Sequence, residues 1–246
     1  MKTILVADQR DDLLATLEPI LKHWGYRVLS TQKASQVTTF LKESNPCMLM
    51  IGEKLLDEKN LVLEESQLKR IRTGQLPSVA LKQGNEGRTE LIPEPPLDVP
   101  LDIFDLYAFI QGRVEKFPRQ NLRLRLRLPG MYRVTAGEYI FADVINLSIA
   151  GLFFKAATKV QKGDRISVVF PLFGRGREII EVESTVLFTV EPEAGNNYFQ
   201  GFGVGFDALQ DNQYAQLRDY IKEHFLREVA ASKNGVGDFA KGQLKD

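Results

Sequence analysis

The sequence has little of what builds metal centres or disulfides. It contains one cysteine and two histidines in 246 residues. Cys47 alone cannot form a disulfide within the chain, and neither His23 nor His224 has a second histidine or a cysteine close by in sequence. We therefore expect no structural metal site, and we interpret both histidines as surface or core-edge residues.

Long apolar runs are also missing. No window approaches the roughly 18 uninterrupted apolar residues that a membrane-spanning helix needs. The opening segment MKTILVADQRDD is too polar to resemble a signal peptide. These absences predict a cytoplasmic protein without a membrane span.

Charge of one sign is not in excess. Lys and Arg number 32, Asp and Glu number 32, and the formal net charge is zero. DNA binding through bulk charge is therefore not expected, and any nucleotide site has to be a local patch. The sequence also shows no nucleophile–base pair, metal cluster or phosphate-binding glycine loop, so we expect neither an enzyme nor a bound cofactor.

The first half of the chain, residues 1–116, alternates apolar strands with amphipathic helices. Strands are predicted at 3–7, 26–31, 47–51 and 76–82, and helices at 12–23, 34–43, 64–72 and 101–116. Residues 84–100 are rich in glycine and proline and are expected to be irregular. The alternation predicts a doubly wound parallel sheet with helices on both faces.

Three features of this half carry a family resemblance. They are ILVAD at the first strand, PCMLMIG at the third, and Pro100 before the last helix. Residues 1–116 thereby resemble the receiver domain of two-component response regulators. The resemblance implies a divalent-cation site and an aspartyl phosphorylation site at the carboxyl ends of the strands.

The residues that would carry this chemistry are mostly replaced. Asp8 remains in register, but its acidic partner is Ala7, and the phosphoacceptor position falls on Gly52. Lys82 stands where receivers have a hydroxyl residue, and Val99 where they have a lysine. Glycine cannot replace a carboxylate nucleophile, and Mg²⁺ requires oxygen ligands.

We therefore predict a degenerate, pseudo-receiver domain that serves packing, dimerisation or docking of a protein partner. Whether nearby Glu53 or Asp57 accepts residual phosphorylation is left open by the sequence.

The second half, residues 117–230, has the pattern of a small antiparallel barrel. The run RLRLRLP from Arg123 alternates strictly, which predicts a strand with leucines on one face and arginines on the other. Short turns separate further runs, giving six or seven strands in all. A helix beginning at Asp211 should lie against the barrel, and residues 231–246 are expected to form a disordered tail. The apolar face of that helix comprises Tyr214, Leu217, Ile221, Phe225 and Val229.

Two short segments of this half have the chemistry of a nucleotide site. Arg119 and Arg123, in RQNLR, can each hold two oxygens of a phosphate or the edge of a guanine with a planar fork. Asn146 and Ser148 stand at i and i+2 in NLSIAG, so an extended chain points both the same way. Gly151 permits a positive φ or the close approach of a ligand to the backbone.

The two segments, in this order and within a barrel pattern, resemble the PilZ domain, a bacterial receptor for cyclic di-GMP. Its hallmarks are R-x-x-x-R and, further on, [D/N]-x-S-x-x-G. The resemblance implies that Arg119 and Arg123 clasp the ligand and that Asn146, Ser148 and Gly151 hold its far guanine. Pro118 stands where family members often have a further arginine, which leaves the ligand stoichiometry open.

Plainer interpretations exist for each piece. Arg125 and Arg127 are expected to be a solvated strand face, and NLSIAG by itself could be a simple turn. The aromatic residues of this half are expected to fill the barrel, namely Phe153, Phe154, Phe170, Phe199 and Phe202.

Two functions follow from these patterns. The first is a cyclic di-GMP receptor in which ligand binding orders the domain junction and changes the domain arrangement or partner contacts. The family resemblance suggests control of motility, pili or exopolysaccharide. The alternative is a PilZ-like adaptor that binds no ligand and acts through protein contacts. The protein partner is unknown, and a homodimer is compatible with either function.

Overall fold

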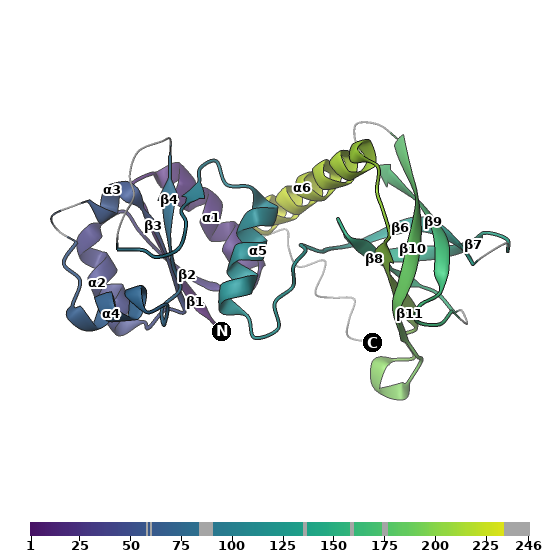
Figure 1. Ribbon diagram of the computed structural model, residues 1–246, viewed down its shortest axis with the longest axis horizontal. Helices are drawn as coiled ribbons and strands as arrows, with labels where there is room; N and C mark the ends of the chain where they lie inside the picture. Colours follow the sequence, from purple (N-terminus) through teal and green to yellow (C-terminus); the bar gives the residue numbers. More distant parts are fainter. Residues whose placement is uncertain are drawn as a thin grey trace. The chain divides into compact units, whose positions relative to one another are not determined.

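The computed structural model describes residues 1–57, 59, 61–83, 91–134, 137–157, 160–173 and 177–233 (Figure 1). The chain divides into two compact units. The first unit comprises Met1–Gln120 together with the chain from Glu228 onward, and the second comprises Asn121–Arg227. No helix in the described ranges is both long and apolar enough to cross a membrane.

The first unit is a parallel sheet covered by helices on both faces. Its elements are β1 (Thr3–Ala7), α1 (Asp11–His23), β2 (Arg27–Thr31), α2 (Ala34–Glu43), β3 (Met48–Gly52), α3 (Glu53–Leu56), α4 (Glu65–Arg72), β4 (Ser78–Lys82), β5 (Leu97–Asp98) and α5 (Ile103–Val114). The strand order is β2-β1-β3-β4-β5, with every neighbouring pair parallel. This is the order of the doubly wound sheet found in receiver-like folds, as predicted.

Both faces of the sheet are covered, and the central strands β1, β3 and β4 are mostly apolar and almost wholly buried. In β3, MLMIG is buried throughout. Leu5, Leu49 and Ala80 face a core built with α2, α3 and α4. Figure 1 shows α1 and α5 on the other side of the sheet. Helix α1 ends just before Gly25, which adopts φ +89°, a left-handed conformation that suits glycine.

Two short elements were not predicted. Strand β5 lies within the segment 84–100 that was expected to be irregular, of which residues 84–90 lie outside the described structure. Its two residues pair with Leu81 and Lys82 of β4. Helix α3 has four residues and follows β3 directly. Neither element is long enough to show a period in the sequence.

The second unit is a closed antiparallel barrel followed by a helix whose residues from Glu228 onward belong to the first unit. Its elements are β6 (Leu124–Val134), β7 (Ile140–Ser148), β8 (Gly151–Lys155), β9 (Arg165–Phe173), β10 (Arg177–Val190), the 3-10 turn η1 (Ala194–Asn196), β11 (Gly201–Phe206) and α6 (Asp211–Lys233). The strands close in the order β10-β11-β8-β7-β6-β9. Six strands and the C-terminal helix confirm the predicted barrel.

The alternation in β6 is realised in the structure. Leu124 and Leu128 are buried, whereas Arg125 and Arg127 are exposed. The barrel interior is aromatic: the Tyr132 and Phe202 rings meet edge-on at 5.0 Å, and Phe154 packs against both. Rings packed in this way fill a small barrel and contribute beyond the area that they bury.

Helix α6 buries most of its predicted apolar face. Leu217, Ile221 and Phe225 are at most 2% exposed, but Tyr214 is 40% exposed, so the prediction for Tyr214 was wrong. In its first turn Gln213 donates to the carbonyl of Glu181 in β10 at 3.1 Å. The helix continues to Lys233, into the segment predicted to be a tail, and residues 234–246 lie outside the described structure.

Candidate ligand-binding site

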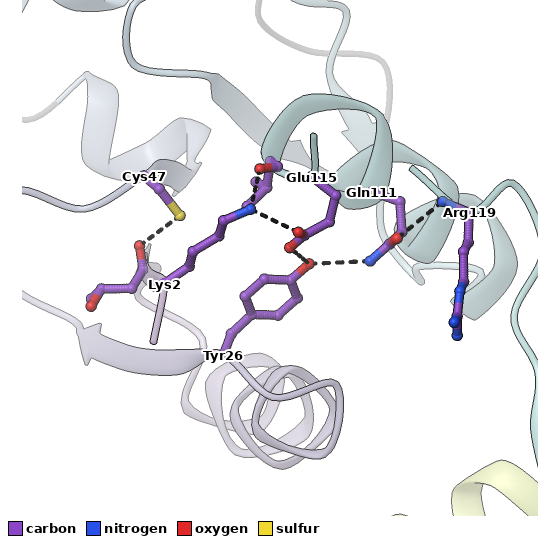
Figure 2. A network of polar contacts seen from close by, with 8 residues as sticks. Lys2, Tyr26, Cys47, Gln111, Glu115 and Arg119 are labelled. Carbon is purple, nitrogen blue, oxygen red and sulfur yellow. Dashed lines mark hydrogen bonds and ion pairs between the residues drawn. The ribbon is translucent and has the colours of Figure 1, made fainter. Parts of the chain in front are cut away.

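Arg119 lies in the first unit, just beyond the end of α5. Its side chain is exposed, and its backbone N–H donates to Oε1 of Gln111 at 3.1 Å. In Figure 2 the guanidinium extends away from Gln111. The backbone of the first motif arginine is thus fixed within its unit while its charged group remains accessible.

Arg123 lies in the second unit, one residue before β6. It is exposed, and the next residue, Leu124, pairs with Leu147 of β7. Arg123 therefore enters the barrel beside the end of β7 that carries Ser148. Within the second unit, the strand register therefore brings Arg123 next to the second motif.

The second motif forms the tight hairpin between β7 and β8. Ser148 pairs with Gly151 across the two-residue turn, and Ser148 is 7% exposed. The Ser148 hydroxyl donates to the Gly151 carbonyl at 3.0 Å and accepts from the Ala150 N–H at 3.4 Å. The serine therefore holds the turn in this structure, in keeping with the plainer interpretation of NLSIAG.

Position 151 needs a glycine because strand β11 passes close to its backbone. Gly151 pairs with Gly205 of β11, and a Cβ at Gly151 would fall on the carbonyl oxygen of Val204. Its φ is not positive, so of the two possibilities that the sequence left open for this glycine, a positive φ is not the one observed. The close approach at this glycine is that of β11, and the sequence could not show which backbone comes near.

One row of outward-facing residues crosses five strands of the barrel. It runs Arg125, Asn146, Phe153, Gly203 and Phe188, each directly opposite the next in the strand register. The ring centroids of Phe153 and Phe188 are 5.9 Å apart, and Phe188 is 44% exposed. The row combines a guanidinium, a carboxamide and an accessible aromatic ring on one surface, which are groups suited to a purine nucleotide.

The aromatic part of this row refines the sequence interpretation. Phe153 and Phe199 were expected to fill the barrel core. Phe153 is buried, at 9% exposed, but it stacks on Phe199 at 5.7 Å and pairs with Asn146, on the face of its strand opposite to Phe154. Neighbouring residues of a strand face opposite sides, so Phe154 fills the interior and Phe153 cannot. Phe188 was not predicted at all, because its place depends on a register shift in β10 between Val186 and Phe188.

The part of the chain that contains these residues matches a known family. Residues 117–223 match the family model described as "PilZ domain". This segment is a PilZ domain. The match covers both motifs, all six barrel strands and most of α6.

Solved structures similar to the chain include PilZ proteins and receiver domains. The inhibitor of motility MotI (DgrA) of Bacillus subtilis is 18% identical over 45% of this chain and 52% of its own, with a TM-score of 0.40. The PilZ domain of YcgR from Escherichia coli, solved with c-di-GMP, is 16% identical over 48% of this chain and 98% of its own, with a TM-score of 0.38.

The receiver domain of a LuxO-type repressor from Vibrio parahaemolyticus is 15% identical over 47% of this chain and 91% of its own, with a TM-score of 0.36. The chain spans about half the length of MotI, 52%. No curated protein matches the sequence.

Upstream of the PilZ domain, the receiver-like unit has an arginine beside the one acidic residue that remains in register. Asp8 is 2% exposed and forms a two-point ion pair with Arg10, at 2.8 Å to Nε and 2.7 Å to Nη2. The Arg10 guanidinium also reaches Gln83 Oε1 at 3.2 Å and the Leu81 carbonyl at 3.4 Å. An arginine of the chain therefore neutralises the carboxylate that a receiver would offer to a metal ion.

Gly52 leaves no room for a phosphoacceptor. A Cβ at this position would fall on the carboxylate of Asp8. Next to it, burial raises the pKa of Glu53, and the Glu53 Oε1 atom is buried without a hydrogen-bond partner in the described part of the chain. Asp57 is exposed at the end of α3.

Asp8, Arg10, Gly52 and Glu53 border a cavity of about 290 Å³ at the carboxyl ends of the strands. Within the described ranges, no group of three or more His, Cys, Asp or Glu side chains is placed to hold a metal ion.

Proposed function

We propose that this protein is a cyclic di-GMP receptor in which the PilZ domain supplies the ligand site. The observation that carries the proposal is that both ligand motifs, RQNLR and NLSIAG, are intact within residues 117–223, which match the PilZ family. Because cyclic di-GMP is an intracellular messenger of bacteria, the proposal places the protein in the cytoplasm.

The roles of the polar groups follow from their chemistry. Arg119 and Arg123 would each offer a planar pair of N–H donors to a phosphate or to the O6 and N7 atoms of guanine. Asn146 and Ser148 would supply amide and hydroxyl groups to the second guanine, and Gly151 would keep the turn open beside them. Phe188, exposed in the same row as Asn146, would offer a face to a purine ring.

The proposed signal is a change at the junction between the units. Arg119 belongs to the first unit and Arg123 to the second, and three residues separate them. A ligand held by both arginines would order the intervening chain and restrict the junction. This would alter the domain arrangement or the surface that the receiver-like unit offers to a protein partner. Control of motility, pili or exopolysaccharide is the output that we propose.

One observation favours the adaptor alternative. The Ser148 hydroxyl already has two partners within its own turn, so ligand binding by this group requires one of them to be exchanged. An adaptor that binds no ligand would keep this turn unchanged.

Isothermal titration of the full chain with cyclic di-GMP distinguishes the two functions. We expect binding by the unmodified chain and an affinity about 10- to 100-fold weaker for Arg123→Ala, the usual loss for a charged hydrogen-bond donor. Arg133→Ala is the matched control, because Arg133 packs over the Tyr139 ring at 4.7 Å near the far end of β6. Absence of binding, or equal affinity for Arg123→Ala, would overturn the receptor function.

A further inference from the structure

The end of helix α5 is held by the side chain of Lys2, the residue that precedes β1. Lys2 Nζ donates to the carbonyl of Val114 at 2.6 Å and to Glu115 Oε2 at 2.7 Å. The last carbonyls of a helix lack partners within the helix and attract a positive charge. Lys2 therefore fixes the point at which the chain leaves α5, over a sequence separation of 113 residues to Glu115.

Tyr26 links this contact to Gln111, which lies one turn earlier in α5. Its hydroxyl donates to Glu115 Oε1 at 2.9 Å and accepts from Gln111 Nε2 at 3.2 Å (Figure 2). Burial and the bond to Glu115 raise the pKa of Tyr26, and the bond to Lys2 is the largest of the effects that lower the pKa of Glu115. Tyr26 therefore stays a donor and Glu115 an acceptor, which leaves the Tyr26 oxygen to accept from Gln111.

Gln111 transmits this orientation to Arg119. A carboxamide has donors at one end and an acceptor at the other, so directing its NH₂ group to Tyr26 turns Oε1 the other way. That oxygen accepts the backbone N–H of Arg119 at 3.1 Å. The bond closes the exposed segment between Glu115 and Arg119 against α5 and so restrains the motif arginine.

We propose that this Lys2–Glu115–Tyr26–Gln111 chain positions Arg119 for the ligand and thereby sets the affinity of the PilZ site. The inference rests on the proposed function. A binding group that is already held in place loses less conformational freedom when the ligand arrives, and affinity rises accordingly. Gln111 and Tyr26 are positioning residues in the receiver-like unit, and that unit would tune the site without any phosphorylation chemistry.

A purely structural role for the same residues makes a different prediction. If Gln111 only stabilised the first unit, its loss would lower stability and leave the affinity of the folded protein unchanged. If it acts through Arg119, its loss weakens binding only while the Arg119 side chain is present. A double-mutant cycle separates the two cases.

The experiment is titration of the full chain with cyclic di-GMP. We expect Gln111→Ala and Tyr26→Phe each to weaken binding about three- to tenfold, the loss of one modest hydrogen bond. In an Arg119→Ala background, Gln111→Ala should change the affinity less than about twofold. Arg113→Ala is the control on the same helix, because Arg113 pairs with Glu94 at 2.7 Å and has no contact in this chain of bonds. It should bind like the unmodified protein.

The outcomes are distinct. Fluorescence of Trp24, the single tryptophan and a residue of the first unit, verifies that each variant is folded. Unmodified affinity in both Gln111→Ala and Tyr26→Phe, or full additivity with Arg119→Ala, would overturn the inference while the receptor function stands. Failure of the unmodified chain to bind would overturn the receptor function, and this inference with it.

Discussion

At the scale of single residues, the receiver-like unit departs from the receiver pattern at more than one position. The Asp8 carboxylate lies where a side chain at Gly52 would project, and Arg10 holds both of its oxygens. Restoring one family residue therefore does not restore the site. The positive charge that a metal ion would bring is already supplied by the chain.

Gly52→Asp tests this interpretation. We expect no phosphorylated product with a small-molecule phosphoryl donor and Mg²⁺, measured by intact-protein mass spectrometry. Crowding against Asp8 should also lower the free energy of unfolding by about 1–3 kcal/mol, measured by urea titration of Trp24 fluorescence. Gly52→Ala is the control for crowding without the added charge. A Mg²⁺-dependent gain of one phosphoryl group would show that Asp8 and Arg10 rearrange readily.

Gly151 has a structural reason independent of any ligand. Gly151→Ala should destabilise the barrel by about 1–3 kcal/mol, because the added methyl group meets the Val204 carbonyl of β11. Gly195→Ala, in η1 of the same unit, has open space around its Cβ position and should change stability by less than about 0.5 kcal/mol. Far-UV circular dichroism during urea unfolding measures both. Equal stabilities of the two variants would contradict the close approach of β11.

At the scale of elements, the C-terminus of α5 is stabilised by charge. The folded state lowers the pKa of Glu115 below its ordinary value, chiefly through Lys2. A carboxylate with a lowered pKa contributes stability above its unfolded pKa and loses it as the pH falls through the folded value. Both side chains of the pair are partly exposed, so the contribution is that of a surface ion pair.

The lowered pKa of Glu115 predicts how the stability of Glu115→Gln changes with pH. Above about pH 5, where an unfolded glutamate is ionised, the variant should be less stable than the unmodified chain by about 0.5–1 kcal/mol. The difference should shrink as the pH falls below about 4. Urea titrations of Trp24 fluorescence across this range measure it. A difference that stays constant with pH would show that the charge of Glu115 contributes nothing.

At the scale of the whole molecule, the two motif arginines belong to different units. If the barrel binds ligand as proposed, we therefore expect the receiver-like unit to become more ordered near Arg119, because the Arg119 backbone is bonded to Gln111. In a folded state that binds ligand, any segment ordered by that ligand exchanges its amide hydrogens more slowly.

Hydrogen exchange measured by mass spectrometry tests this coupling. Saturating cyclic di-GMP should slow exchange in the β7–β8 turn of the barrel and also in residues 115–119. Gln111→Ala should retain the first effect and reduce the second. Arg123→Ala at the same ligand concentration is the control for binding itself. Slower exchange confined to the barrel would show that the receiver-like unit does not respond.

The sequence by itself determined the order and type of the long elements. Alternation in RLRLRLP required leucines on one face of β6, and uninterrupted apolar runs such as MLMIG required a doubly covered sheet. These are properties of neighbouring residues, so a period in the chain suffices to read them. The short β5 and α3 were not predicted because they contain too few residues to show a period.

The tertiary structure alone decided which side chains meet. The outward position of Phe153 and Phe188 depends on barrel closure and on register shifts in β7 and β10. Tyr26 reaches Glu115 across 89 residues of sequence, and Arg10 closes on Asp8 at the carboxyl end of β1. Such contacts follow from the register of strands and the packing of helices, which no local pattern encodes.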